Sequence, residues 1–236
     1  MDVKQVNETL NLYIRPQTFP LALRLCRSES EIPEGAKMPL RDLGYQVTLC
    51  QAYGISRHYG WTLAVGNDDQ CCIGGAWAMG FPIVYPEGMP VPPAERKLED
   101  GKYSHLVIAP LEMADFEAEV IAIYGSAAQV CRLVQAVIFP TGQTISANMG
   151  GAANCGTMIA RTLLSDECQF ILHCGGDRMY GGTQDNEVIF TMPWGKVEAV
   201  LKGLESTHNF GFKYPILIDI THRPTMPQWL EVPRAT

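Results

Sequence analysis

Four cysteines lie beside glycines or at the ends of expected elements, where a thiol could bind a metal or attack a substrate. They are Cys50, Cys72, Cys155 and Cys174. The thiolate is the form of cysteine that binds metals and acts as a nucleophile. The chain contains no CxxC motif and no CxxCxxC run. A zinc or iron–sulfur site would therefore have to be assembled from these four residues across both halves of the chain.

A glycine-rich turn over residues 146–156 leads into an expected helix. Asn154 and Cys155 fall at the start of that helix, where unpaired N–H groups and the helix dipole favour an anion or a thiolate. We expect Gly150, Gly151 and Asn154 to bind a ligand, and Cys155 to be a metal ligand or a catalytic nucleophile. The alternative is that the glycines only permit close helix–sheet packing. The turn matches neither the GxGxxG nor the Walker pattern.

The run HCGGDR at residues 173–178 is the third candidate. Cys174 ends an expected strand, and Gly175 and Gly176 would let a ligand approach the backbone closely. Arg178 could bind a carboxylate through two hydrogen bonds. We therefore include all four among the expected ligand-binding residues. The alternative is a structural turn with a surface ion pair, which is common and weak.

The segments that must position these groups alternate between helical and extended patterns. Helices are predicted over residues 3–13, 45–58, 126–139, 154–164 and 194–204, with Asp42 and Ser126 as N-caps and Gly60 as a stop. Strands are predicted over residues 21–26, 61–65, 119–124, 144–148, 169–174 and 187–191. This alternation predicts an α/β or α+β fold, a compact mixed sandwich forming a single domain over residues 1–236.

The two halves share a spacing of cysteine and arginine. Cys50, Arg57 and Cys72 recur as Cys155, Arg161 and Cys174, at offsets of 105, 104 and 102. We interpret this as an internal duplication with related halves over residues 40–100 and 119–206. The proline-rich segment 82–100 would be a boundary or a surface lid, and the proline-rich tail 215–236 would wrap the surface.

Composition narrows the class of protein. The 236 residues carry a net charge of −7 without a basic run, which argues against a nucleic-acid partner. No apolar stretch is long enough for a membrane span or a signal peptide, so we expect a cytoplasmic protein. Eight cysteines in a reducing compartment should be thiols or metal ligands rather than disulfides. Cys26 and Cys131 lie within apolar patterns and are expected to be plain core.

Five passages resemble the uncharacterised domain of unknown function 169 family of archaea and bacteria. They are LCQAYGISRHYGWTLAVGNDDQCCIGGAWAMGF (49–81), VIAIYGSAAQVCRLVQAVIFPTG (120–142), ISANMGGAANCGTMIAR (145–161), ILHCGGDRMYGGTQDNEVIFTMP (171–193) and KVEAVLKGL (196–204). The resemblance implies that several candidate residues fall in the marked blocks of the family, namely Cys50, Cys72, Cys155, Cys174, Gly176 and Arg178. It brings no established activity.

The leading hypothesis is a cytoplasmic protein with a thiol-lined site for a small anionic molecule or for a metal centre. Zinc and an iron–sulfur cluster are the candidate cofactors. One alternative is an enzyme that uses Cys155 as its nucleophile. Another is a non-catalytic subunit or scaffold held by a homodimer face.

Overall fold

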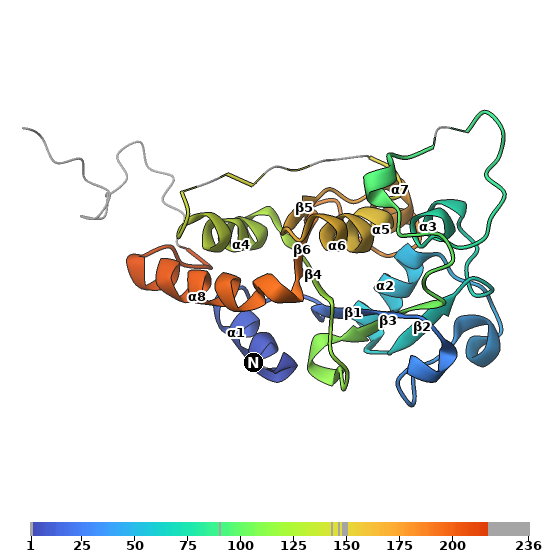
Figure 1. The fold of residues 1–236 in the computed structure, drawn as a ribbon. Coiled ribbons are helices and arrows are strands. Elements are labelled where there is room, and N and C mark those ends of the chain that lie inside the picture. The colour runs from blue at the N-terminus through green and yellow to red at the C-terminus, as the bar shows by residue number, and fades with distance from the viewer. Residues whose placement is uncertain (1, 90, 143, 146, 148–150, 217–236) are drawn as a thin grey trace, which may run out of the picture.

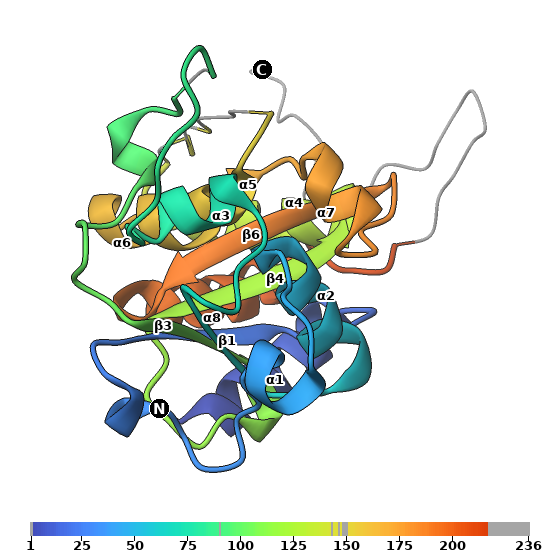
Figure 2. The ribbon, with the colours of Figure 1, turned by 90° about the vertical axis from the view of Figure 1, so that its right-hand side faces the viewer.

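The computed structural model describes residues 2–89, 91–142, 144–145, 147 and 151–216. Their strands form one six-stranded sheet in the order β2-β3-β1-β4-β6-β5, and all neighbouring strands are antiparallel. Figure 2 shows the long strands β4 and β6 side by side. The strand bounds are β1 Leu21–Cys26, β2 Leu63–Gly66, β3 His105–Pro110, β4 Val120–Ser126, β5 Gln169–Ile171 and β6 Glu187–Pro193.

Helices cover both faces of the sheet. The apolar cluster on one face includes side chains of α2, α3 and the helical stretch that follows α5, and the cluster on the other face includes those of α1, α4 and α8. Figure 1 shows α3, α5, α6 and α7 gathered on one side of the molecule, away from α1 and α8. The helix bounds are α1 Val3–Tyr13, α2 Leu49–Tyr59, α3 Ile73–Ala78, α4 Ala127–Ile138, α5 Asn154–Gly156, α6 Thr162–Ser165, α7 Gly175–Met179 and α8 Trp194–Phe210.

Apolar side chains on both faces of the strands explain why the sheet is buried on both sides. In β1, Leu21 and Leu23 pack into the α2 side, whereas Ala22 and Cys26 pack into the α1 side. Successive side chains of a strand point to opposite faces, so a strand that is apolar throughout needs a helical layer on each side. The protein is therefore a mixed α/β sandwich, as the sequence predicted.

Several predicted boundaries are confirmed. The helix over 3–13 and the strand over 21–26 match α1 and β1. Ser126 caps α4 through a capping box with Gln129, and Gly60 ends α2 in the left-handed conformation with φ of 77°. Each follows from local chemistry, since a short polar side chain satisfies free N–H groups and glycine tolerates positive φ.

The predicted cap of α2 is wrong. Thr48, not Asp42, caps this helix, and its hydroxyl accepts the Gln51 N–H. The Asp42 carboxylate instead accepts the Met38 N–H and pairs with Arg41. Asp42 lies in a separate helical turn, and α2 begins four residues later than predicted.

Other differences concern elements whose pattern depends on tertiary packing. The strand predicted over 169–174 stops at Ile171, and β3, α3 and α7 were not predicted. Cys131 is exposed on α4 rather than buried. The buried face of this helix includes Val130 and Leu133, and Cys131 lies outside that face. The strand predicted over 144–148 falls partly outside the described residues. The predicted tail over 215–236 falls outside them from residue 217 onward.

The strand order has an internal symmetry. From the centre outward the order is β1, β3, β2 in the first half and β4, β6, β5 in the second half. In both halves the third strand along the chain therefore lies next to the central strand, and the second strand lies at the edge. Cys72 and Cys174 both immediately precede short helices, and Cys50 and Cys155 are both second residues of helices. An internal duplication would produce these parallels, and it stays a prediction.

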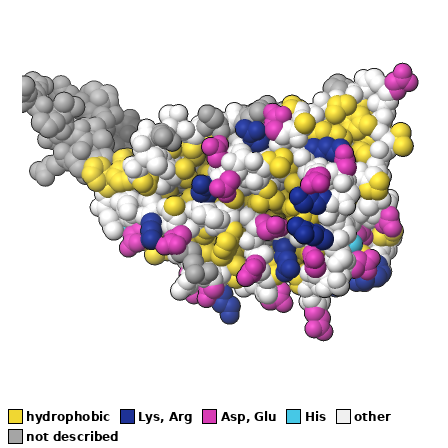
Figure 3. Space-filling view, viewed as in Figure 1, with side chains coloured by type: hydrophobic (Ala, Val, Ile, Leu, Met, Phe, Trp, Pro, Cys, Tyr) yellow, Lys and Arg dark blue, Asp and Glu magenta, His cyan; other side chains and the backbone are white. Residues whose placement is uncertain are grey.

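No helix in the described part of the chain has the length and apolar character that a membrane span requires. On the face shown in Figure 3, Lys and Arg side chains lie interspersed with Asp and Glu side chains.

Candidate functional site

Cys50 enters the site from the first turn of α2. The backbone of α2 is held against the segment after α7, because a Cβ atom at Gly54 would lie 2.5 Å from the Gly181 carbonyl oxygen, and one at Gly181 would lie 2.7 Å from the Cys50 carbonyl oxygen. Cys50 is 5% exposed and belongs to the apolar cluster on the α2 side of the sheet. The glycine pair thus sets the approach of Cys50 to the α7 region.

Cys174 and Asp177 enter from the start of α7. The Asp177 Oδ2 atom accepts the Cys174 N–H at 2.8 Å, which joins both residues in one capping interaction. Asp177 is 1% exposed, and its other carboxylate oxygen, Oδ1, has no hydrogen-bond partner among the described residues. A buried carboxylate oxygen without a partner costs free energy, so it needs an explanation.

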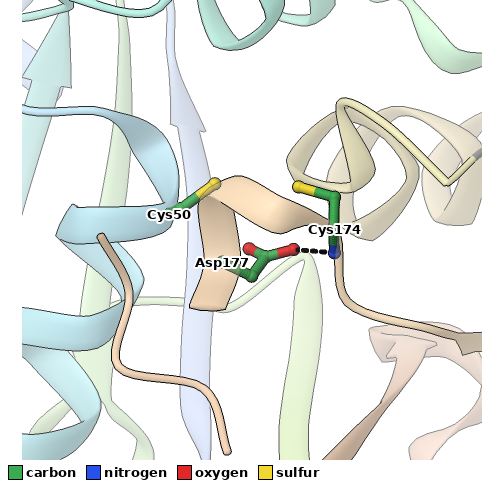
Figure 4. A group of neighbouring side chains, drawn as sticks. All are labelled: Cys50, Cys174 and Asp177. Carbon is green, nitrogen blue, oxygen red and sulfur yellow. Dashed lines mark hydrogen bonds between the residues drawn. The ribbon is translucent and has the colours of Figure 1, made fainter. Parts of the chain in front are cut away.

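Three ligand atoms converge at this point. The Cys50 sulfur, the Cys174 sulfur and a carboxylate oxygen of Asp177 all lie within 4.8 Å of one another. Figure 4 shows both sulfurs directed toward each other, with the Asp177 carboxylate beside them. Cys155, on α5, is 2% exposed and lies near enough to raise the pKa of Cys50, but its sulfur is not among the three converging ligand atoms. We call Cys50, Cys155, Cys174 and Asp177 the thiol centre.

The pKa values of Cys50 and Cys174 are shifted in opposite directions. A hydrogen bond from Cys50 lowers the pKa of Cys174 to about 6, against the effects of burial and of the Asp177 charge; the N–H groups of Asp177 and Asn154 act in the same direction as Cys50. Hydrogen bonds with Cys155 and Cys174, together with burial, raise the pKa of Cys50. The arrangement is therefore a Cys174 thiolate that accepts a hydrogen bond from the Cys50 thiol.

A buried ion pair anchors α2, the helix that carries Cys50. The guanidinium of Arg57, on α2, donates to both oxygens of Glu187 at 2.8 and 3.1 Å and lies 4.1 Å from the ring centre of Tyr124. Tyr53 lies one turn after Cys50 on α2, and its buried hydroxyl has no partner in the described part of the chain. The ion pair fixes α2, and with it Cys50, to the start of β6.

Arg96 lies next to residues 152–157, in a helical turn of the proline-rich segment. Its Nε donates to the Thr157 hydroxyl at 2.8 Å, and its Nη2 donates to the carbonyls of Ala152 and Ala153 and to Asn154 Oδ1. It is 4% exposed. Arg96 thus binds two backbone carbonyls and one side chain before Cys155 and one side chain after it.

The structure separates two of the predicted residues from the centre. Cys72 is half-buried at the start of α3 and is not among the converging ligand atoms. Arg178 points to the surface, where it pairs with Asp185. Gly150 lies outside the described residues, so its predicted role stays open.

Other predicted residues surround the centre. Asn154 is buried, and its side-chain amide donates to the Leu172 carbonyl. Gly176 lies against both sulfurs, since a Cβ atom there would lie 3.5 Å from Cys50 Sγ and 3.6 Å from Cys174 Sγ. Gly151 and Gly175 are exposed. Ligand binding by the glycines and catalysis by Cys155 stay predictions.

Sequence reasoning missed three residues of the site. Asp177 follows Cys174 by three residues, the spacing of a capping box, and this signal could have placed its carboxylate beside the thiol. Tyr53 lies one turn after Cys50 on α2, so helix periodicity could have placed the two on one face. Arg96 gives no local signal, because it reaches the centre only through packing between segments distant in the sequence.

The fold and the site define a mixed α/β protein with a buried cluster of thiols and one carboxylate. The family described as uncharacterised ArCR, domain of unknown function 169, matches residues 9–203, and the chain belongs to this family. The chain is 27% identical over 229 residues to the uncharacterized protein MJ0308 of Methanocaldococcus jannaschii, covering 87% of this chain and 96% of that protein. No solved structure matches it.

Proposed function

We propose that the thiol centre binds one soft divalent metal ion, with zinc as the first candidate. Cys50, Cys174 and Asp177 would be three ligands, and Cys155 the fourth. The observation that carries the proposal is the buried Asp177 carboxylate: one of its oxygens lies within 4.8 Å of both sulfurs, and its Oδ1 atom has no hydrogen-bond partner among the described residues. A bound cation would satisfy this oxygen and neutralise the charge of the neighbouring sulfurs.

The charge of the centre favours a cation over the small anionic molecule that we first considered. Asp177 and the Cys174 thiolate share one buried volume, and the charge of Asp177 opposes the ionisation of Cys174. A bound anion would add to this repulsion. Arg178, the cation expected to hold an anion, pairs with Asp185 at the surface. These contacts support a metal ligand set.

The spacing of the ligand atoms favours a single ion over an iron–sulfur cluster. Zinc binds sulfur at about 2.3 Å in a tetrahedral arrangement, so two thiolates on one ion lie about 3.8 Å apart. The ligand atoms of Cys50, Cys174 and Asp177 lie within 4.8 Å of one another and need only small side-chain movements to reach that geometry. A cluster distributes its cysteines over several irons and needs a wider set.

The burial of the ligands favours a structural role. Cys50, Cys155 and Cys174 all belong to one apolar cluster, and four protein ligands would leave no coordination position for a substrate. The ion would join α2, from the first half of the chain, to α5 and α7, from the second half. It would thereby stabilise the contact between the halves.

Metal analysis of the purified protein tests the proposal. Protein purified without oxygen and reconstituted with Zn²⁺ should hold about one ion per chain, and Co²⁺ in its place should give the sulfur-to-cobalt absorption of thiolate ligands. The Cys174→Ser and Asp177→Asn variants should lose most of this binding. Cys131→Ser is the matched control, because Cys131 is exposed on α4. Wild-type protein that takes up neither ion would refute the proposal.

A further inference from the structure

Arg96 is a buried cation whose hydrogen bonds go to neutral acceptors. Three of these acceptors precede Cys155 in the chain, at positions 152–154, and the fourth is the hydroxyl of Thr157. No carboxylate of the described residues forms a salt bridge with Arg96. A guanidinium buried without an anionic partner is costly, unless a negative group lies near enough to compensate its charge.

The thiols of Cys155 and Cys174 are the groups that most favour the charged form of Arg96. Burial lowers the pKa of Arg96, and the charges of Cys155 and Cys174 oppose this effect most strongly. Asn154 lies between the two, since its side-chain oxygen accepts from Arg96 and its backbone N–H group lowers the pKa of Cys174. Arg96 therefore acts near the centre as a charge and as a hydrogen-bond donor to residues 152–157.

We infer that Arg96 is the positioning residue of the thiol centre, which it supplies with counter-charge while it holds residues 152–157 around Cys155. The inference rests on the proposed metal function. A ligand set of three thiolates and one carboxylate leaves a divalent ion with excess negative charge, and Arg96 offsets part of it. The same side chain connects the proline-rich segment to residues 152–157, so residues 94–96 have a structural role at the centre.

Two replacements separate the charge of Arg96 from its shape. Arg96→Gln removes the charge, and Arg96→Lys keeps the charge but loses the planar fork of donors. Arg41→Gln is the matched control, because Arg41 is an exposed arginine paired with its neighbour Asp42. Zn²⁺ affinity and the Co²⁺ spectrum are measured for all three variants. Labelling of Cys155 and Cys174 by N-ethylmaleimide is measured in the metal-free proteins.

Arg96→Gln should weaken Zn²⁺ binding roughly 10- to 100-fold, as expected for a residue that orients metal ligands, and should shift the Co²⁺ absorption. Arg96→Lys should recover part of the affinity. Labelling of Cys155 should accelerate in both variants, because residues 152–157 lose their anchor. Folded Arg96→Gln protein with the affinity, spectrum and labelling rate of Arg41→Gln would overturn the inference.

The labelling arm separates this inference from the proposed function. If wild-type protein binds neither ion, the metal proposal fails, and unchanged labelling of Cys155 in the Arg96 variants then overturns the positioning role as well. Faster labelling supports that role without a metal. If Arg96→Gln does not fold, Arg96→Lys provides the same comparison against Arg41→Gln.

Discussion

Replacing Glu187 by Gln should destabilise the protein strongly, because it leaves Arg57 charged and buried. Arg57 is 1% exposed, and both of its terminal nitrogens donate to the Glu187 carboxylate. Removing one partner of a buried pair costs about 3–5 kcal/mol. The glutamine oxygen still accepts one hydrogen bond, so we expect a loss of roughly 3 kcal/mol in the free energy of unfolding. Urea denaturation followed by tryptophan fluorescence measures it.

Two controls identify the cause of that loss. Asp185→Asn breaks the exposed pair with Arg178 and should change stability by about 0.5 kcal/mol or less. The double variant Arg57→Met, Glu187→Leu removes both charges and should recover much of the stability. If Glu187→Gln unfolds at the same urea concentration as wild type, or if the double variant is worse than the single one, the argument from an unpaired buried charge is wrong.

The pH dependence of the same pair has a defined sign. Burial alone raises the pKa of Glu187, but hydrogen bonds from Arg57 and from the Gln184 N–H, with the Arg57 charge, bring it below the ordinary value of 4.5. A lowered carboxyl pKa contributes stability that is present above the ordinary value and is lost as the pH falls through the folded value. Wild-type protein should therefore lose this contribution below pH 4.5, and Glu187→Gln should not.

Three further predictions concern packing and the thiols. Gly203→Ala should lower the melting temperature despite the better helix propensity of alanine, because its Cβ would lie 2.0 Å from the Ala136 carbonyl oxygen; an unchanged melting temperature would show that α4 and α8 can separate freely. In metal-free protein the ultraviolet absorbance of the Cys174 thiolate should appear with a midpoint near pH 6 and be missing in Cys174→Ser, and a midpoint near 9 would contradict the hydrogen bonding described. The contribution of this thiolate to the stability of the fold should be complete above pH 9 and be lost as the pH falls through about 6. N-ethylmaleimide should label exposed Cys131 well before buried Cys155 in native protein, and mass spectrometry that finds the reverse order would revive the nucleophile hypothesis for Cys155.

Local chemistry allowed the sequence to predict much of the secondary structure. The apolar face and caps of α4, the stop at Gly60 and the alternation of β1 depend on residues within a few positions of each other. The alternation of elements also predicted the mixed α/β class. Elements shorter than two turns, such as α3 and α7, escaped prediction because their few residues carry no periodic signal.

The spacing of thiols and glycines, which is similar in both halves, can be seen in the sequence, and it made Cys50, Cys155 and Cys174 candidates for a site. Which of these thiols meet depends on tertiary packing, because the antiparallel sheet brings α2 of one half against α7 of the other. Tertiary packing brought in Asp177, excluded Cys72 from the converging ligand atoms, and placed Arg96 against residues 152–157. Contacts between residues tens of positions apart depend on how whole elements pack, and no local pattern records them.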